Sequence, residues 1–142
     1  MPTPTFDQLK TWARRYVELW NAGDKDAWVE NWRSVAPGKF RMLDPVGTPQ
    51  KVGFAACALE PWDLFQQRVR FKIADGCLFI NGNEVAWLLE NHLTVDGKEV
   101  VGRSIETYRF EEDGSVVVRT YYKVPPRAKN ELGEMFQEYL PE

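Results

Sequence analysis

The sequence predicts an α+β fold, with helices packed on one face of a curved sheet, and two observations support this prediction. Apolar residues recur at three- and four-residue spacing in the first half of the chain and alternate with a period of two after residue 68. Asp-Gly and Asn-Gly pairs separate the alternating segments at 75–76, 81–82, 96–97 and 113–114. Helices followed by consecutive strands are typical of this class. The length of 142 residues favours one domain, expected over residues 1–142.

The first helix is predicted over residues 5–21. Thr5 can cap its N-terminus, and Gly23 can end it. The apolar face of this helix carries Phe6, Leu9, Ala13, Tyr16 and Trp20. Tyr16 therefore points toward the core, where its hydroxyl group needs a hydrogen-bond partner.

Further helical segments are predicted over residues 25–33, 53–67 and 129–139. Asp24 can cap the first of these, whose apolar face carries Trp28 and Trp32. The second is expected to break at Pro61, because proline lacks a backbone donor.

Strands are predicted over residues 69–74, 77–80, 84–95, 99–110 and 115–124. Asn91 lies on the apolar face of strand 84–95, together with Trp87 and Leu89, and a buried amide must pair with protein, water or ligand. His92 falls on the opposite face, where we interpret it as a solvated or interface residue. The last strand is apolar on both faces, which would suit burial against helices and a partner subunit.

Asp44 is the best candidate for a working acid or base. It ends a short apolar run, and Pro45 restricts it to extended backbone geometry. From a strand end, its carboxylate could lean into an apolar cavity, where desolvation raises a carboxyl pKa. Asp before Pro also commonly begins a turn, so the local sequence supports both interpretations.

Glu106 shares one face of strand 99–110 with small and aromatic residues. If buried, this carboxyl group must either pair with a cation or stay protonated, and in the protonated form it can donate a hydrogen bond. The alternative interpretation is a surface carboxylate that makes cross-strand pairs.

Composition and charge narrow the possible function classes. A net charge of -3 gives no reason to expect a nucleic-acid partner. Two cysteines, Cys57 and Cys77, and one histidine do not suit the usual zinc sites, and we expect reduced thiols, with a disulfide as the alternative. No apolar run approaches the roughly 18 residues of a membrane span, and no secretory signal pattern is present, so we expect a cytoplasmic protein without membrane or metal partners. The six tryptophans either fill the core or line a ligand cavity.

The order of these elements resembles the nuclear transport factor 2-like superfamily, which includes SnoaL-like proteins, and the chain is most similar to its bacterial ketosteroid isomerases. The resemblance covers residues 6–123 and rests on the segments 15–24, 44–53 and 105–114. It implies a cone-shaped fold, in which N-terminal helices and a curved antiparallel or mixed sheet enclose a pocket, and it implies no cofactor.

The resemblance also implies catalytic roles. Asp44 would be the general base that moves a proton between carbons of an enone, and Tyr16 and Glu106 would donate hydrogen bonds to the oxyanion. The expected substrate-binding residues are Trp20, Trp32, Trp87, Leu89, Asn91 and Arg119.

Two positions depart from the isomerase pattern. Glu106 stands where the family usually has aspartate, and Trp32 stands where some members have a second tyrosine. Arg119 and Lys123 could also face the pocket. An Arg119–Glu106 pair would keep Glu106 ionised and favour a more polar substrate.

We therefore expect a cofactor-independent, isomerase-type enzyme that shuttles a proton next to the carbonyl group of a small hydrophobic, steroid- or polyketide-like substrate. The alternatives are a ligand-binding protein without chemistry, a SnoaL-like cyclase or dehydratase acting on a more polar substrate, and an interaction protein. Thr120 disfavours the cyclases and epoxide hydrolases of the superfamily, which usually place an aspartate in that neighbourhood. A homodimer through the sheet face is expected in every case.

Overall fold

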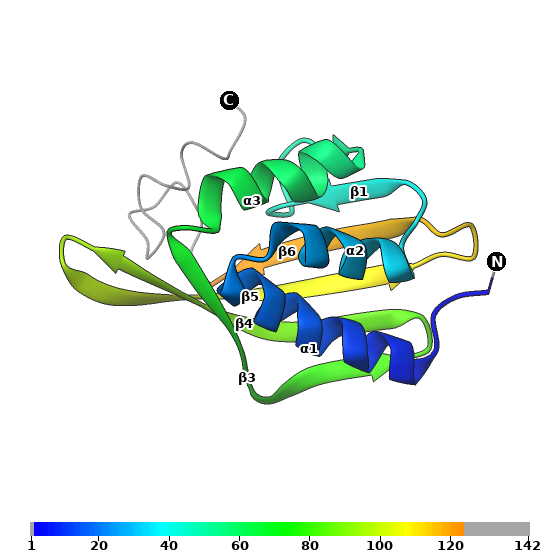
Figure 1. The fold of residues 1–142 in the computed structure, drawn as a ribbon, viewed down its shortest axis with the longest axis horizontal. Coiled ribbons are helices and arrows are strands. Elements are labelled where there is room, and N and C mark those ends of the chain that lie inside the picture. Colours follow the sequence, from blue (N-terminus) through cyan, green and yellow to red (C-terminus); the bar gives the residue numbers. More distant parts are fainter. Residues whose placement is uncertain (1, 124–142) are drawn as a thin grey trace.

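The computed structural model describes residues 2–123, in which helices cover one face of a six-stranded sheet (Figure 1). The helices are α1 (Phe6–Ala22), α2 (Lys25–Val35) and α3 (Glu60–Phe65), the last preceded by a π-helical turn at Ala55–Leu59. The predicted helix 129–139 and residue 124, the predicted end of the last strand, lie outside the described residues. Within residues 2–123, no helix is long and apolar enough to cross a membrane.

The two N-terminal helices begin and end as predicted. The Thr5 hydroxyl group accepts from the Gln8 N–H, and the Gln8 side chain accepts from the Thr5 N–H, which forms a capping box. Gly23 ends α1 with a left-handed φ of 72°. The Asp24 carboxylate caps α2 by accepting from the Ala27 N–H.

The strands are β1 (Phe40–Leu43), β2 (Lys51–Val52), β3 (Val69–Asn81), β4 (Glu84–Val95), β5 (Lys98–Phe110) and β6 (Val116–Tyr122). Their order in the sheet is β2-β1-β6-β5-β4-β3. Neighbouring strands are antiparallel except β1 and β6, which are parallel. This parallel pair brings the strand that leads to Asp44 against the last described strand of the chain.

Two local predictions are wrong, and one strand was missed. Segments 69–74 and 77–80 form one strand, because a bulge between Ile73 and Leu78 accommodates the Asp-Gly pair without ending the pairing to β4. The helix does not break at Pro61, because this proline lies in the first turn of α3, where a missing N–H removes no helical hydrogen bond. Strand β2 was not predicted, because two residues are too few to show an alternating pattern.

The core lies between the helices and the inner face of the sheet, and it is rich in aromatic rings. All six tryptophans are buried. The centroid of the Trp12 ring lies 5.0–5.6 Å from those of Tyr16, Trp32, Trp87, Tyr108 and Phe110. Each such ring pair contributes about 0.5–1.5 kcal/mol beyond its buried area.

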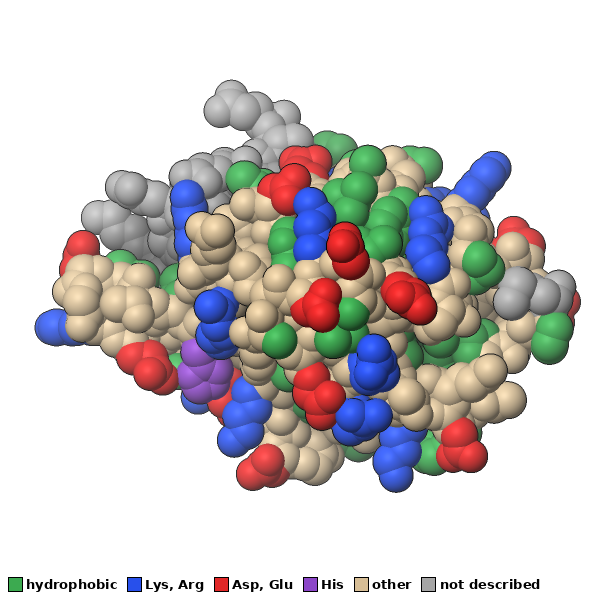
Figure 2. Space-filling view, in the orientation of Figure 1, with side chains coloured by type: hydrophobic (Ala, Val, Ile, Leu, Met, Phe, Trp, Pro, Cys, Tyr) green, Lys and Arg blue, Asp and Glu red, His purple; other side chains and the backbone are tan. Residues whose placement is uncertain are grey.

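The two surfaces of the molecule differ in character. On the helical face, positive and negative side chains are intermingled (Figure 2). On the outer face of the sheet, the register aligns Leu88, Ile105 and Tyr121 across β4, β5 and β6. Ile105 and Tyr121 are 48% and 42% exposed.

A candidate active site between the helices and the sheet

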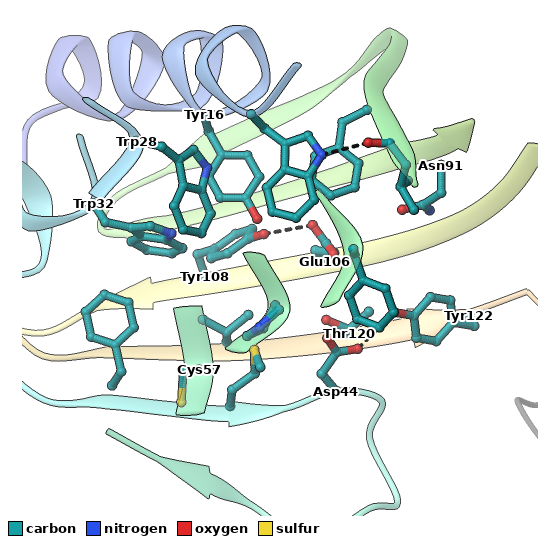
Figure 3. A pocket seen from close by; sticks show the side chains of 18 residues that line it. Tyr16, Trp28, Trp32, Asp44, Cys57, Asn91, Glu106, Tyr108, Thr120 and Tyr122 are labelled. Atoms are coloured by element: carbon teal, nitrogen blue, oxygen red, sulfur yellow. Dashed lines mark hydrogen bonds between the residues drawn. The ribbon is translucent and has the colours of Figure 1, made fainter. Parts of the chain in front are cut away.

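A cavity lies between the helices and the inner face of the sheet and is partly open to solvent (Figure 3). Its volume is about 80 Å³, and because one water needs about 10–15 Å³ of such space, it has room for a small organic molecule. Its walls are mostly aromatic, and its polar groups are those of Tyr16, Asp44, Asn91, Glu106, Tyr108, Thr120 and Tyr122. An apolar pocket with a few convergent polar groups is typical of small-molecule sites.

Asp44 reaches the cavity from the end of β1. Its Oδ1 atom accepts a hydrogen bond from the Tyr122 hydroxyl group at 3.0 Å. The chain turns immediately afterwards: the Val46 N–H donates to the Thr120 carbonyl oxygen at 2.9 Å, and the Thr48 hydroxyl group donates to that of Pro45 at 2.7 Å. The two interpretations of Asp44 are therefore compatible, because it begins a turn and its side chain lines the cavity.

Glu106 lines the cavity from β5 and is held by two donors on the same oxygen. The Trp87 indole N–H and the Tyr108 hydroxyl group each donate to its Oε1 atom at 2.7 Å. Burial, together with the nearby charge of Asp44, raises the pKa of Glu106 to about 7, although the two hydrogen bonds oppose this shift. Because both lone pairs of Oε1 accept, the acid proton lies on Oε2.

Tyr16 reaches the same group from α1. Its hydroxyl group lies beside the Tyr108 hydroxyl group, which donates to Glu106 (Figure 3). Burial raises the pKa values of both tyrosines well above their ordinary range, so both stay protonated. Tyr16 and Glu106 both line the cavity, so each can donate a hydrogen bond to a bound molecule.

The structure therefore brings Tyr16, Asp44 and Glu106 to one cavity. Trp20, Trp32 and Asn91 also line it. Trp87 and Leu89 are fully buried in the core and do not line the cavity. Trp87 nevertheless donates a hydrogen bond to Glu106, which does line it.

The expectation that Arg119 faces the cavity is wrong. The β5–β6 register pairs Glu106 with Thr120, and adjacent residues of a strand point to opposite faces. Arg119 is exposed and its Nε donates to the Tyr121 hydroxyl group at 3.1 Å. Lys123 is exposed as well. No Arg119–Glu106 pair forms, which removes the reason to expect Glu106 to be ionised by a cation.

Sequence reasoning missed several polar residues of the cavity. Tyr108 lies two residues from Glu106 on the same face, and Tyr122 lies two residues from Thr120, so strand alternation could have identified both. The Cys57 thiol lines the cavity next to these groups, and burial raises its pKa to about 11, which leaves it protonated. Cys57 and Cys77 are not joined by a disulfide.

The histidine and the acidic residues offer no metal centre within residues 2–123, where no group of three or more potential His, Cys, Asp or Glu ligands gathers. His92 lies outside the cavity, as predicted, and its ring nitrogens hydrogen-bond Glu90 and Glu99 at 2.9 and 3.1 Å.

Solved structures with the same fold are known. SalBIII, an epoxide hydrolase/cyclase-like enzyme with a role in pyran ring formation in the polyether salinomycin, is 23% identical, with 81% of this chain and 90% of that chain covered and a TM-score of 0.65. A putative SnoaL-like polyketide cyclase from Jannaschia sp. CCS1 is 15% identical, with 87% and 90% covered and a TM-score of 0.65. RV0760c from Mycobacterium tuberculosis is 18% identical, with 86% and 96% covered and a TM-score of 0.61.

No protein-family model and no curated protein matches the sequence. At these identities, the likeness to solved structures establishes the fold alone. The predicted α+β fold of the nuclear transport factor 2-like type is confirmed, with its helices packed on a six-stranded mixed sheet.

Proposed function

We propose that this protein is a cofactor-independent enzyme that moves a proton at a carbon atom next to the carbonyl group of a small, largely apolar substrate. One observation carries the proposal: two carboxyl groups, Asp44 and Glu106, line one aromatic cavity, and the pKa of Glu106 is raised to about 7 while that carboxyl accepts two hydrogen bonds on one oxygen. A base and an acid on one substrate are what this reaction needs.

In the proposed reaction, the Asp44 carboxylate removes a proton from the carbon next to the carbonyl group. The negative charge that develops on the carbonyl oxygen is stabilised by a hydrogen bond from Glu106 Oε2, while Tyr108 donates to the other oxygen of that carboxyl group. Tyr16, which lines the same cavity, is the second expected donor. Asp44 then returns the proton to another carbon of the same molecule, so that no proton is gained or lost overall.

The size of the cavity limits the size of the substrate. A volume of about 80 Å³ suits a substrate of one or two rings better than a four-ring steroid. The aromatic walls, which include Trp20, Trp28 and Trp32, favour a flat, apolar body. We therefore infer a smaller substrate than the resemblance to ketosteroid isomerases alone would imply.

A second candidate is a ring-forming or ring-opening reaction at oxygen. Here Asp44 would take the proton of an attacking hydroxyl group, and Glu106 would give its proton to the leaving oxygen. The observation that favours it is that burial raises the pKa of Glu106 to about 7, which keeps a transferable proton on an acid that lines the same cavity as Asp44. SalBIII, which has the same fold, is described as having a role in pyran ring formation.

The proposal is tested with Asp44→Asn, which keeps the shape of the side chain and removes the base. We expect isomerisation of 3-cyclohexenone to 2-cyclohexenone, followed by the absorbance of the conjugated product, to fall by about 10³-fold. Asp75→Asn, at an exposed position, is the matched control and should keep full activity.

Unchanged turnover in Asp44→Asn would contradict the assignment of the base. If the wild-type protein binds cyclic enones without converting them, and the binding persists in Asp44→Asn and Tyr16→Phe, the protein is a ligand-binding member of the fold instead.

We also propose a homodimer through the outer face of the sheet. The row formed by Leu88, Ile105 and Tyr121 gives this face a contiguous apolar strip, and Phe79 of β3 is exposed on the same sheet. Exposed apolar strips of this kind mark interaction sites.

A further inference from the structure

Asn91 is a buried polar side chain at some distance from the two carboxyl groups. It lines the cavity from β4, four residues along the strand from Trp87, which pairs with Glu106 in the sheet (Figure 3). Its side chain is surrounded by protein, and the residue is only 8% exposed. The chemistry of this amide is therefore set by a few neighbours.

Those neighbours fix the orientation of the amide. Its Nδ2 atom donates to the Gly102 carbonyl oxygen at 3.3 Å and to the Ser104 hydroxyl oxygen at 3.2 Å. A carbonyl oxygen can only accept, so the NH₂ group must lie on the Gly102 side. Both N–H donors are thereby used.

The Oδ1 atom is left on the other side of the amide and accepts no hydrogen bond from any residue between 2 and 123. Because Oδ1 is not among the fully enclosed polar atoms that lack a partner, it is reached from the cavity, where a donor of a bound molecule can meet it. The missing partner must be a donor, because two acceptors would repel.

We propose that Asn91 Oδ1 accepts a hydrogen bond from a donor group, a hydroxyl or an amine, at the end of the substrate remote from the reacting carbonyl group. This inference rests on the proposed function, since it places the reacting end at Asp44 and Glu106. It makes the substrate class a ketone that carries a distal hydroxyl or amino group, and it makes Asn91 the residue that selects for it.

The strand geometry gives the spacing of the two polar ends. Four residues of strand separate the Trp87–Glu106 pair from Asn91 by about 13 Å of backbone. Because Glu106 and Asn91 both extend into the cavity from the sheet, this separation sets the scale for their polar atoms, and a hydrogen bond of about 3 Å at each end leaves about 7 Å between the two polar atoms of the substrate. Two fused six-membered rings with substituents at opposite ends have this span. The same size suits the cavity.

Binding of planar two-ring probes tests the inference without any need for turnover. The probes are 2-naphthol, 2,6-dihydroxynaphthalene and 6-methoxy-2-naphthol, and binding is followed by the fluorescence of the probe. The methoxy compound keeps the distal oxygen but lacks its proton. We expect the wild-type protein to bind the dihydroxy compound about tenfold more tightly than the methoxy compound, as expected of one hydrogen bond to a buried acceptor. A similar preference for 6-amino-2-naphthol over 2-naphthol would show that an amine also serves.

Two variants test whether the preference for the dihydroxy compound arises from Asn91 Oδ1. Asn91→Leu keeps the size of the side chain and removes the acceptor, so the preference should fall below about twofold while 2-naphthol still binds. Ser104→Ala removes one contact of the amide and leaves Oδ1 in place, so the preference should persist.

The inference is overturned if the wild-type protein binds the dihydroxy and methoxy compounds equally, if it binds none of the probes, or if Asn91→Leu retains the preference. Failure of the proposed function is a separate result, because loss of turnover is measured in Asp44→Asn, whereas these measurements depend on binding alone.

Discussion

The two carboxyl groups of the cavity have the same chemistry but different surroundings. Glu106 extends from the middle of a long strand and receives hydrogen bonds from Trp87 and Tyr108 on one oxygen, and its pKa is raised to about 7. Asp44 stands at a corner where the chain leaves the sheet, and it accepts a hydrogen bond from the Tyr122 hydroxyl group. Both side chains line the same cavity, but burial and the nearby charge of Asp44 favour the neutral form of Glu106, whereas we propose that Asp44, at the corner, acts as the base.

The largest loss of activity that separates the roles of the two carboxyl groups is expected from substitutions of Glu106. Glu106→Leu removes the proposed donor to the substrate, so kcat/KM should fall by about 10²–10³-fold. Glu106→Gln keeps a donor, because its amide oxygen can accept from Trp87 and Tyr108 while its NH₂ group faces the cavity. An isomerase, which needs only a hydrogen bond, should keep most of its activity in Glu106→Gln.

A ring-forming enzyme should lose its activity in both variants, because an amide cannot deliver a proton to a leaving oxygen. Equal activity of Glu106→Leu and wild type would show that Glu106 takes no part in either reaction.

The pH dependence of the rate sharpens the assignment of the acid. Because the pKa of Glu106 is about 7, kcat/KM should fall as the pH rises through 7 and the acid loses its proton. In Glu106→Gln this fall should be absent. A wild-type profile that stays flat between pH 6 and 8 would contradict the assignment.

The titration of Glu106 should also make the stability of the protein depend on pH. The folded protein holds the Glu106 proton up to about pH 7, whereas the unfolded chain releases it near the ordinary value of 4.5. Between these values the folded state binds more protons, so the free energy of unfolding should decrease as the pH rises, by about 1–3 kcal/mol. Contacts with Glu99 and Glu90 also raise the pKa of His92, which adds a loss of stability above pH 6.5. Denaturation of wild type and Glu106→Gln isolates the contribution of Glu106 as their difference.

A smaller effect is expected from the donors that hold Glu106. Tyr108→Phe removes one hydrogen bond to Oε1 that lowers the pKa of Glu106, so this pKa should rise and the alkaline limb of the rate profile should move to higher pH. Nuclear magnetic resonance of ¹³C-labelled glutamate measures the pKa directly. Tyr121→Phe, on the outer face of the sheet, is the matched control and should leave it unchanged. An unchanged Glu106 pKa in Tyr108→Phe would mean that the hydroxyl contact is not maintained in solution.

The smallest effect on activity is expected from the outer face of the sheet. Ile105→Lys places a charge in the apolar strip and should shift a dimer toward monomer in sedimentation experiments, while the cavity on the other face keeps its lining. Thr107→Lys, also on the outer face but one pair away from the strip, is a milder control. A wild-type protein that sediments as a monomer would contradict the proposed homodimer.

Much of the fold could be predicted because short local patterns mark where the helices and strands begin and end. Thr5, Gly23 and Asp24 mark helix ends by their own chemistry, and the Asn-Gly or Asp-Gly pairs at 81–82, 96–97 and 113–114 mark turns, whereas the pair at 75–76 lies in a bulge. A residue of the cavity could be predicted only where a pattern shows that its side chain points inward. Helical spacing shows this for Tyr16, and strand alternation shows it for Glu106. Arg119 was misplaced because its own strand is apolar on both faces. Alternation separates Arg119 from Thr120 and Tyr122, but only the pairing of Thr120 with Glu106 shows which of the two faces is the inner one.

The hydrogen bond between Tyr122 and Asp44 joins residues 78 positions apart, and the Val46–Thr120 bond crosses a similar interval. The corner that holds Asp44 is thus completed by the last described strand and not by its own neighbours. A chain emerging from the ribosome would form its helical layer and the β3–β4–β5 meander, the more local contacts, well before this closure. Loop closure over such an interval is slow compared with hairpin formation, so the two carboxyl groups should meet late in folding.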